Sequence, residues 1–222
     1  MSHKPKANSN TLQASGNLGY HITQALLSSG FTVTAVTRES STSTFPAEVQ
    51  VRTADLSSLE SLTKAFAGQD AVICNIATSE AGNQKFLADA AVAAGMKRFI
   101  PSEFGFNTRP GKISHPVVEQ LPYMVAKKET VDYLEELAAK NLGFTWTGLA
   151  TNMWLDWALD RGLFPISPFN RSAAIYDSGN GPISACTLDF IGQAVVAILQ
   201  REQVMGIRRL LNCLVLYPKR QA

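Results

Sequence analysis

The sequence predicts an α/β fold, a doubly wound parallel sheet with helices on both faces. Over the first 150 residues, short apolar runs rich in β-branched residues alternate with longer segments whose apolar residues have helical spacing. The chain of 222 residues is 45% hydrophobic, which is enough for one sizeable core and excludes global disorder. No run approaches the roughly 18 apolar residues of a membrane-spanning helix, so we expect no membrane association.

The elements follow one another as strand–helix–strand units. Residues 18–28 have helical spacing and stop at Gly30, and residues 31–37 (FTVTAVT) are typical of a buried strand. Ser57 and Glu60 have the spacing of a capping box for a helix over residues 59–66. The remaining predicted strands are residues 48–54, 71–76, 98–100, 144–149 and 210–217, and the remaining predicted helices are residues 81–94, 123–140 and 188–200.

Charge and cysteine content exclude several function classes. Positive charge collects in the two ends of the chain while the body carries an acidic excess, so direct nucleic-acid binding is not expected. The three cysteines, Cys74, Cys186 and Cys213, have no CxxC spacing, which argues against a disulfide scaffold or a metal site and predicts a reducing, cytoplasmic location. The first ten residues hold no apolar stretch of the kind found in secretory signals.

A glycine-containing turn opens the first predicted helix. Residues 13–19 read QASGNLG, and a Gly-x-x-Gly-x-x-Gly turn lets the backbone approach a pyrophosphate at a helix N-terminus. Gly16 and Gly19 occupy the last two glycine positions, but Gln13 occupies the first. Residues 8–12 (NSNTL) are also polar where a buried central strand is normally apolar. Dinucleotide binding and an ordinary strand-to-helix turn both remain open here.

The ends of the next two strands hold residues that can select a cofactor. Arg38 follows the second strand about 20 residues after the turn, where an arginine takes a ribose 2′-phosphate and an acid takes the free hydroxyl. This favours NADP over NAD, although Arg38 can also be a solvated surface residue. Asp55 ends the following strand, where it can contact the adenine or cap the next helix.

Several segments resemble the NmrA-like and isoflavone-reductase-like proteins, which are atypical short-chain dehydrogenases that bind NADP(H). The segments are residues 14–19 (ASGNLG), 33–38 (VTAVTR), 68–73 (GQDAVI), 97–105 (KRFIPSEFG) and 144–148 (FTWTG). The resemblance covers about residues 12–200 and implies a Rossmann-like fold with NADP(H) as cofactor. It suggests a polar tail over residues 1–10, an NAD(P)-binding domain over residues 11–150 and a partial substrate-binding region over residues 151–222.

Two departures from this family suggest a chain that is shortened at the first strand and at the C-terminus. The family has an apolar first strand that ends in a glycine, whereas this chain has polar residues and Gln13. Residues 203–222 do not resemble the family, whose longer C-terminal part shapes the substrate pocket. We therefore expect an incomplete substrate-capping region.

The predicted site residues lie at strand ends and on the helix over residues 123–140. Tyr123 and Lys127 are four residues apart and share a helix face, the spacing of the short-chain dehydrogenase Tyr–Lys pair. Ser102 follows a strand where a third hydrogen-bonding residue sits in these folds. The resemblance makes Lys127 the main functional group, with Lys128 as the alternative by one residue, while Tyr123 can equally be a buried aromatic anchor. Glu103 and Phe104 are expected to be structural parts of a loop near the nicotinamide. The expected cofactor-binding residues are Ser15, Gly16, Asn17, Leu18, Gly19, Arg38, Asp55, Asn75, Ala77 and Lys127.

Together these features predict an NADPH-dependent reductase of a small apolar or aromatic oxygenated metabolite in secondary metabolism. Met153, Trp154 and Trp157 can form an apolar wall over the site or pack in the core. The alternative is a non-catalytic NADP(H)-sensing regulator of the NmrA type, which would act through a protein partner. A third possibility is a product that binds no cofactor because its first strand is altered.

Overall fold

The computed structural model describes residues 8–12, 14–109, 120–163, 166–167, 169–175, 178, 183–201 and 209–212. Within these residues a sheet of seven strands, all parallel, has the order β11-β6-β5-β4-β1-β2-β3. Strands 3-2-1-4-5-6 of this order follow the arrangement of dinucleotide-binding folds. The predicted α/β fold with parallel strands is therefore confirmed. The strands are β1 (Asn8–Leu12), β2 (Thr32–Thr37), β3 (Gln50–Thr53), β4 (Ala71–Cys74), β5 (Arg98–Ile100), β6 (Thr145–Ala150) and β11 (Arg209–Asn212).

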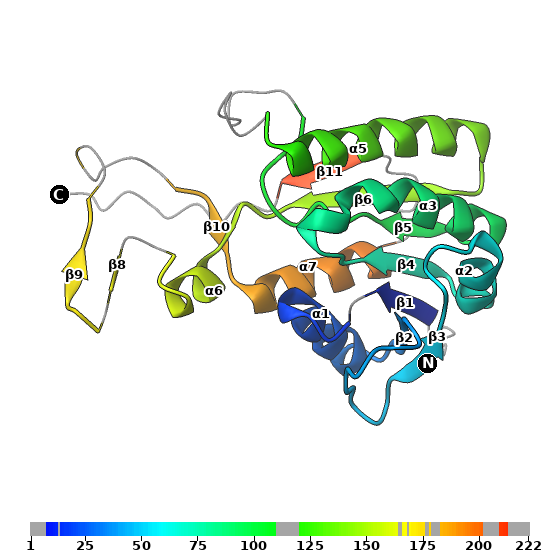
Figure 1. Cartoon of the computed structure of the whole chain (residues 1–222), viewed down its shortest axis with the longest axis horizontal. Helices are drawn as coiled ribbons and strands as arrows, with labels where there is room; N and C mark the ends of the chain where they lie inside the picture. The colour runs from blue at the N-terminus through cyan, green and yellow to red at the C-terminus, as the bar shows by residue number, and fades with distance from the viewer. Residues whose placement is uncertain are drawn as a thin grey trace.

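Helices cover both faces of the sheet (Figure 1). On one face α1 (Asn17–Ser28) and α7 (Leu188–Gln200) share a core with the side chains of β2, β4, β5 and β6. On the other face α2 (Leu59–Phe66), α3 (Gln84–Ala93) and α5 (Pro122–Lys140) pack over a second core that contains Trp146 and Phe99. Because parallel strands are covered on both sides, their side chains are buried in continuous runs, as in β4.

The two helices on the first face approach each other closely. A Cβ atom added at Gly192 of α7 would lie 2.8 Å from the carbonyl oxygen of His21 in α1. His21 Nδ1 also lies 2.6 Å from Asp189 Oδ1 at the first turn of α7. Residues 151–222, which the sequence assigns to the substrate region, thus supply α7 and β11 to the layers of the sheet domain.

The polar first strand forms and lies at the centre of the sheet. β1 pairs with β2 on one side and with β4 on the other. Residues 8–10, which the sequence assigns to a tail, form the first part of this strand. Ser9 and Thr11 are buried, and neither hydroxyl finds a hydrogen-bond partner in the described part of the chain. Pairing on both sides therefore holds a strand that side-chain polarity disfavours. Gln13 lies outside the described residues.

Three other local expectations need correction. Helix α2 is capped by Ser58, whose side chain accepts a hydrogen bond from the Ser61 backbone N–H, so the predicted Ser57–Glu60 capping box is not the cap. The predicted helix over residues 81–94 is split into a 3₁₀ helix, η1 (Thr78–Asn83), and α3. The predicted strand over residues 71–76 ends at Cys74, two residues early.

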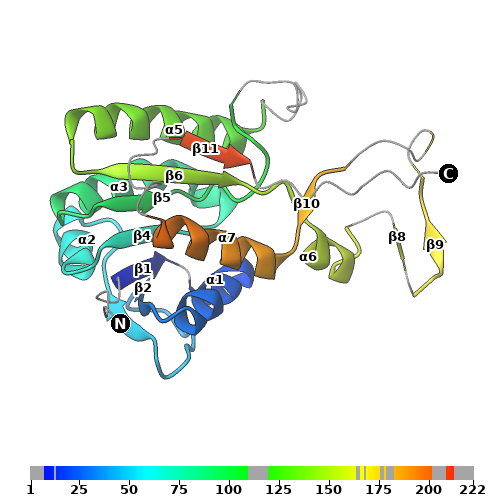
Figure 2. The same ribbon diagram turned by 180° about the vertical axis from the view of Figure 1, so that it is seen from behind.

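A smaller part of the chain extends from the carboxyl edge of the sheet. It holds β7 (Met153–Trp154), α6 (Leu155–Asp160) and β10 (Ala185–Cys186), followed outward by the antiparallel pair β8 (Ile166–Ser167) and β9 (Ser172–Ala173). Figures 1 and 2 show the β8–β9 pair projecting away from the sheet. Across the described ranges, none of the helices has the length and apolar character to span a bilayer.

Candidate functional site

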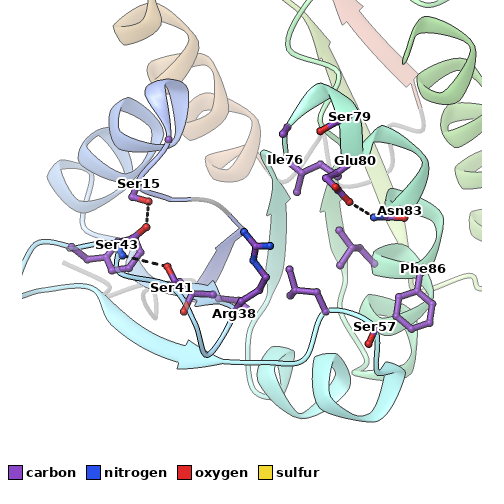
Figure 3. A pocket seen from close by; sticks show the side chains of 17 residues that line it. Ser15, Arg38, Ser41, Ser43, Ser57, Ile76, Ser79, Glu80, Asn83 and Phe86 are labelled. Atoms are coloured by element: carbon purple, nitrogen blue, oxygen red, sulfur yellow. Dashed lines mark hydrogen bonds between the residues drawn. The ribbon is translucent and has the colours of Figure 1, made fainter. Parts of the chain in front are cut away.

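A cavity of about 780 Å³ opens at the carboxyl edge of the sheet, where β1, β2 and β4 end (Figure 3). The turn before α1, the loop after β2 and the segment around η1 form its walls. It therefore lies where doubly wound sheets bind ligands, at the point where the strand order reverses. The cavity is lined by Ser15, Gly16, Val36, Thr37, Arg38, Ser41, Ser43, Phe45, Leu56, Ser57, Ile76, Ala77, Ser79, Glu80, Asn83, Phe86 and Leu87.

Arg38 is the cation in this lining. It directly follows β2, is exposed, and points its guanidinium group into the cavity (Figure 3). Its backbone carbonyl accepts a hydrogen bond of 3.0 Å from the Ser41 N–H, which turns the chain back beside the cavity. A guanidinium fork at this place can bind an oxyanion through two hydrogen bonds.

The turn before α1 supplies a second feature suited to an anion. Gly16 is the N-cap of α1, forms no side-chain capping bond and is followed by no acidic residue in the first turn. With no side-chain cap from the described N-cap residue, the first N–H groups of the helix can donate to a bound anion. Ser15 Oγ donates a hydrogen bond of 2.8 Å to Ser43 Oγ, which ties this turn to the loop after β2.

The other predicted cofactor residues have different positions. Asn17 is exposed at the first turn of α1, whereas Leu18 and Gly19 are buried against the sheet. Asn75 is buried at the end of β4, and Ala77, two residues later, lines the cavity. The structure thus places Ser15, Gly16, Arg38 and Ala77 around one cavity.

Asp55 lines an adjacent hollow of about 700 Å³ that shares Arg38, Leu56 and Ser57 with the cavity. Its Oδ1 accepts hydrogen bonds from the Ser57 N–H at 2.9 Å and the Ser57 hydroxyl at 2.6 Å. These hydrogen bonds lower the pKa of the exposed Asp55 carboxyl. Asp55 does not cap α2, whose N-cap is Ser58; it shapes the turn before that helix and borders a hollow that Arg38 also lines, and its contact with an adenine stays a prediction.

Ser102 lies directly behind the cavity wall. Its hydroxyl donates a hydrogen bond of 3.2 Å to the carbonyl oxygen of Ile76, a lining residue. Its backbone N–H donates one of 2.6 Å to Oε1 of the buried Gln84. In this arrangement Ser102 holds the end of β4 against the loop after β5.

Lys127 and Lys128 differ in their surroundings. Lys128 is exposed on α5, whereas Lys127 is partly buried, and burial lowers the pKa of its amine. The Glu103 carboxylate and, to a smaller degree, Cys74 act in the opposite direction on the Lys127 pKa. Tyr123 is partly buried one helical turn earlier on α5. Burial thus distinguishes Lys127 from Lys128, which the sequence could not separate.

Glu103 is completely buried in the loop after β5. Its Oε2 accepts a hydrogen bond of 2.7 Å from Thr108 Oγ1. Burial raises the pKa of Glu103, while the nearby Lys127, Thr108 and Arg109 oppose that shift. Cys74, at the end of β4, is also buried, and desolvation raises its pKa to about 12. A buried group of ionisable side chains therefore lies between the ends of β4 and β5 and helix α5.

Sequence reasoning did not identify the polar residues that complete the cavity. Ser41 and Ser43 belong to a serine- and threonine-rich stretch that reads as a plain loop, and its place directly after β2 was the available signal. Glu80 and Asn83, which are hydrogen-bonded to each other, come from η1, a segment read as part of a regular helix. Thr108 has no sequence pattern that points to Glu103.

The tryptophans and His21 lie away from the cavity lining. Trp154 and Trp157 pack edge to face with centroids 5.8 Å apart and lie against the core of α1 and α7, which is core packing. His21 bridges to Asp189, as described above. The described ranges contain no group of three or more potential metal ligands.

Comparison with known proteins identifies relatives of most of the chain. The model of the NmrA-like family matches residues 11–158. An oxidoreductase of Penicillium oxalicum, poxI, is 41% identical over 191 residues, which is 85% of this chain and 59% of that protein. The chain thus spans about three-fifths of the length of this curated relative.

Solved structures share the fold at low sequence identity. The structure of AtPrR2 with NADP+ and (+)pinoresinol superposes with a TM-score of 0.75 at 20% identity and covers 94% of this chain and 70% of its own. That of an isoflavone reductase gives a TM-score of 0.71 at 19% identity, with 94% and 69% covered. These likenesses confirm the Rossmann-like arrangement of the fold, while the family model confirms the resemblance to the NmrA-like family.

Proposed function

Since the chain belongs to the NmrA-like family, we propose that it is an NADPH-dependent reductase of a small apolar or aromatic oxygenated metabolite, with a role in secondary metabolism. The observation that carries the proposal is the convergence of Arg38 and the uncapped N-terminus of α1 on one cavity. The loop that carries Glu103 is tied to this cavity, since the hydroxyl of Ser102, the residue directly before Glu103, bonds to the carbonyl oxygen of Ile76 in the cavity wall.

The residues of the cavity fit NADP(H). Gly16 and the first N–H groups of α1 would hold the pyrophosphate, and Arg38 would pair with the 2′-phosphate. Arg38 takes the position directly after β2 at which an acidic residue would hold a free 2′-hydroxyl, and Glu39 is the next residue along the chain. Selectivity for NADPH over NADH therefore rests on one guanidinium group.

Proton transfer would be the task of α5. Bound NADPH supplies the hydride. As the reacting oxygen gains negative charge, Lys127 Nζ would donate a proton to it, with Tyr123 one helical turn away as a second hydrogen-bond donor. Ser102 would keep the loop after β5 in place through Ile76. The names of the relatives support this chemistry, since poxI is called an oxidoreductase and AtPrR2 was solved with NADP+ and (+)pinoresinol.

The test is turnover of NADPH by the purified chain. The protein is incubated with NADPH and a panel of aromatic ketones and enones, and NADPH oxidation and the reduced product are both measured. The reductase proposal predicts oxidation coupled to one reduced product for at least one compound class. Binding of NADPH with no turnover across the panel would instead support an NADP(H)-sensing regulator, and no binding would contradict both functions.

A further inference from the structure

The Glu103 carboxyl group is unusual because it is buried and only half satisfied. Glu103 has no exposed surface, and its Oε2 accepts a hydrogen bond of 2.7 Å from the Thr108 hydroxyl. Oε1 has no hydrogen-bond partner in the part of the chain that the structure describes. Burial of a carboxylate is strongly unfavourable unless a nearby positive charge compensates it. The charged groups that act on Glu103 are Lys127 and Arg109.

Arg109 is engaged elsewhere. Its Nη1 lies 2.7 Å from Asp132 Oδ1, and its Nη2 contacts Glu135, so it ties the loop after β5 to two carboxylates of α5. Lys127 is therefore the main compensating charge for Glu103, and it is also the largest of the charges that lower the Glu103 pKa.

The backbone brings Lys127 to this loop. Lys127 Nζ lies 3.9 Å from the position that a Cβ atom would take at Gly105, two residues after Glu103. The carbonyl oxygen of Gly105 accepts a hydrogen bond of 2.8 Å from the Asn152 N–H, which holds the loop against the end of β6. The Lys127 ammonium group thus lies within van der Waals distance of the loop that carries Glu103.

Cys74, the other titratable group that acts on Lys127, carries no charge at ordinary pH. Cys74 lies at the end of β4, and because its pKa is raised to about 12 its thiol is neutral at ordinary pH. Its influence on Lys127 is smaller than that of Glu103. The charge balance at Lys127 therefore depends chiefly on one carboxylate.

From this geometry we propose that Glu103 is a positioning residue for Lys127, whose buried carboxylate keeps the amine charged and in place for proton transfer. The inference rests on the proposed function for its catalytic meaning, and it deepens that function by assigning what prepares Lys127. Only a proton moves in the step concerned. The N–H bond at Lys127 Nζ breaks, an O–H bond forms at the reacting oxygen, and solvent later returns the proton to Nζ.

The test measures the protonation of Lys127 directly in the protein without substrate. The chain is labelled with ¹⁵N-lysine, the Nζ signal of Lys127 is assigned by its loss in Lys127→Met, and its pKa is followed by NMR over pH. In Glu103→Gln the pKa of Lys127 is expected to fall by about 1 to 3 units, the effect of removing a nearby opposite charge. Glu103→Asp, which keeps the charge, is expected to restore part of the shift.

Two further variants make the test specific. Glu129→Gln changes an exposed carboxylate of α5 that pairs with Lys85 at 3.0 Å, and it is expected to leave the pKa of Lys127 unchanged. Thr108→Val removes the hydrogen bond that favours ionised Glu103, and a smaller fall in the Lys127 pKa is expected even if Glu103→Gln does not fold. An unchanged Lys127 pKa in folded Glu103→Gln, or in Thr108→Val, would overturn the proposal.

The same variants connect the titration to turnover. If the chain reduces a substrate, the alkaline limb of its kcat profile should move to lower pH in Glu103→Gln by the amount measured for Lys127, since the charged amine is the proton donor. A titration that shifts as expected in a chain without turnover would contradict the proposed function and leave the charge coupling intact. Turnover with an unmoved alkaline limb would overturn the role of Glu103 alone.

Discussion

Lys127 and Lys128 are adjacent on α5 and chemically identical, yet they face different surroundings. In the sequence, the four-residue spacing from Tyr123 predicts that Lys127 shares the helix face of the site. Because Lys128 is the next residue, the sequence alone does not decide between the two lysines. The structure separates them by burial, since Lys128 is exposed and Lys127 lies beside Gly105 and Glu103. We therefore predict that Lys127, and not Lys128, donates the proton.

We expect Lys127→Met to reduce kcat by at least about 100-fold, the lower end of what a positioned proton donor contributes. Methionine keeps the length and apolar stem of lysine, so loss of the charge is the main change. Lys128→Met is the matched control and should retain the turnover of the unmodified chain in the same NADPH oxidation assay. An equal loss in both variants, or a loss in Lys128→Met alone, would contradict the assignment.

Only some of the other residues of the site could be predicted from the sequence. Arg38 and Gly16 could be predicted because they occupy fixed places relative to a strand and a helix. Glu103 was predicted as a structural loop residue, because its burial and its pairing with Thr108 depend on how the loop after β5 folds back beneath α5. Ser43 contacts Ser15 across 28 residues of sequence, and no local pattern encodes such a contact.

At the scale of elements, β1 shows how tertiary pairing overrides side-chain preference. Its sequence, NSNTL, lacks the apolar character of a central strand, and residues 8–10 were expected to be a tail. In the register of the sheet, Thr11 lies between Ala35 of β2 and Ile73 of β4, both in the core under α1 and α7. Its hydroxyl is one of the buried groups without a partner among the described residues.

Replacing that hydroxyl should stabilise the chain. Thr11→Val keeps the shape and removes the unsatisfied group, so the free energy of unfolding should rise by about 1 kcal/mol or more. For a chain of this size the Tm should increase by roughly 2 to 4 °C per kcal/mol in a thermal unfolding experiment. Thr53→Val, at an exposed position of β3, is the control and should change the Tm little. A lower Tm in Thr11→Val would show that the hydroxyl is satisfied.

The contact of α1 with α7 gives a second prediction for elements. Gly192→Ala would bring a Cβ atom within 2.8 Å of the His21 carbonyl, a backbone atom that cannot move away alone. The two helices would have to separate, and overpacking of this kind costs about 1 to 3 kcal/mol in the free energy of unfolding. Gly143→Ala, where nothing lies within 4 Å of the added Cβ, should cost little in the same denaturant titration. Equal stability of the two variants would mean that α1 and α7 pack more loosely.

At the scale of the whole molecule, the order of the strands determines where the site lies. Alternating strand and helix patterns were sufficient to predict a parallel sheet with helices on both faces, and the reversal of strand order then places a cavity between β1 and β4. The sequence could not predict how residues beyond 150 divide between layers. There, α7 and β11 join the sheet domain while the β8–β9 pair projects from it.

We propose that this arrangement selects NADPH through Arg38. The most direct measurement is calorimetric titration of the chain and of Arg38→Ala with NADPH and with NADH. We predict that the chain binds NADPH more tightly than NADH, and that Arg38→Ala weakens NADPH binding by about 10- to 100-fold, as expected for loss of a charge-assisted hydrogen-bond pair, while NADH binding changes little. Arg201→Ala, an exposed arginine at the C-terminal end of α7, is the control and should bind as the unmodified chain does. Equal affinity for both cofactors, or an Arg38→Ala variant that keeps its preference for NADPH, would contradict the account.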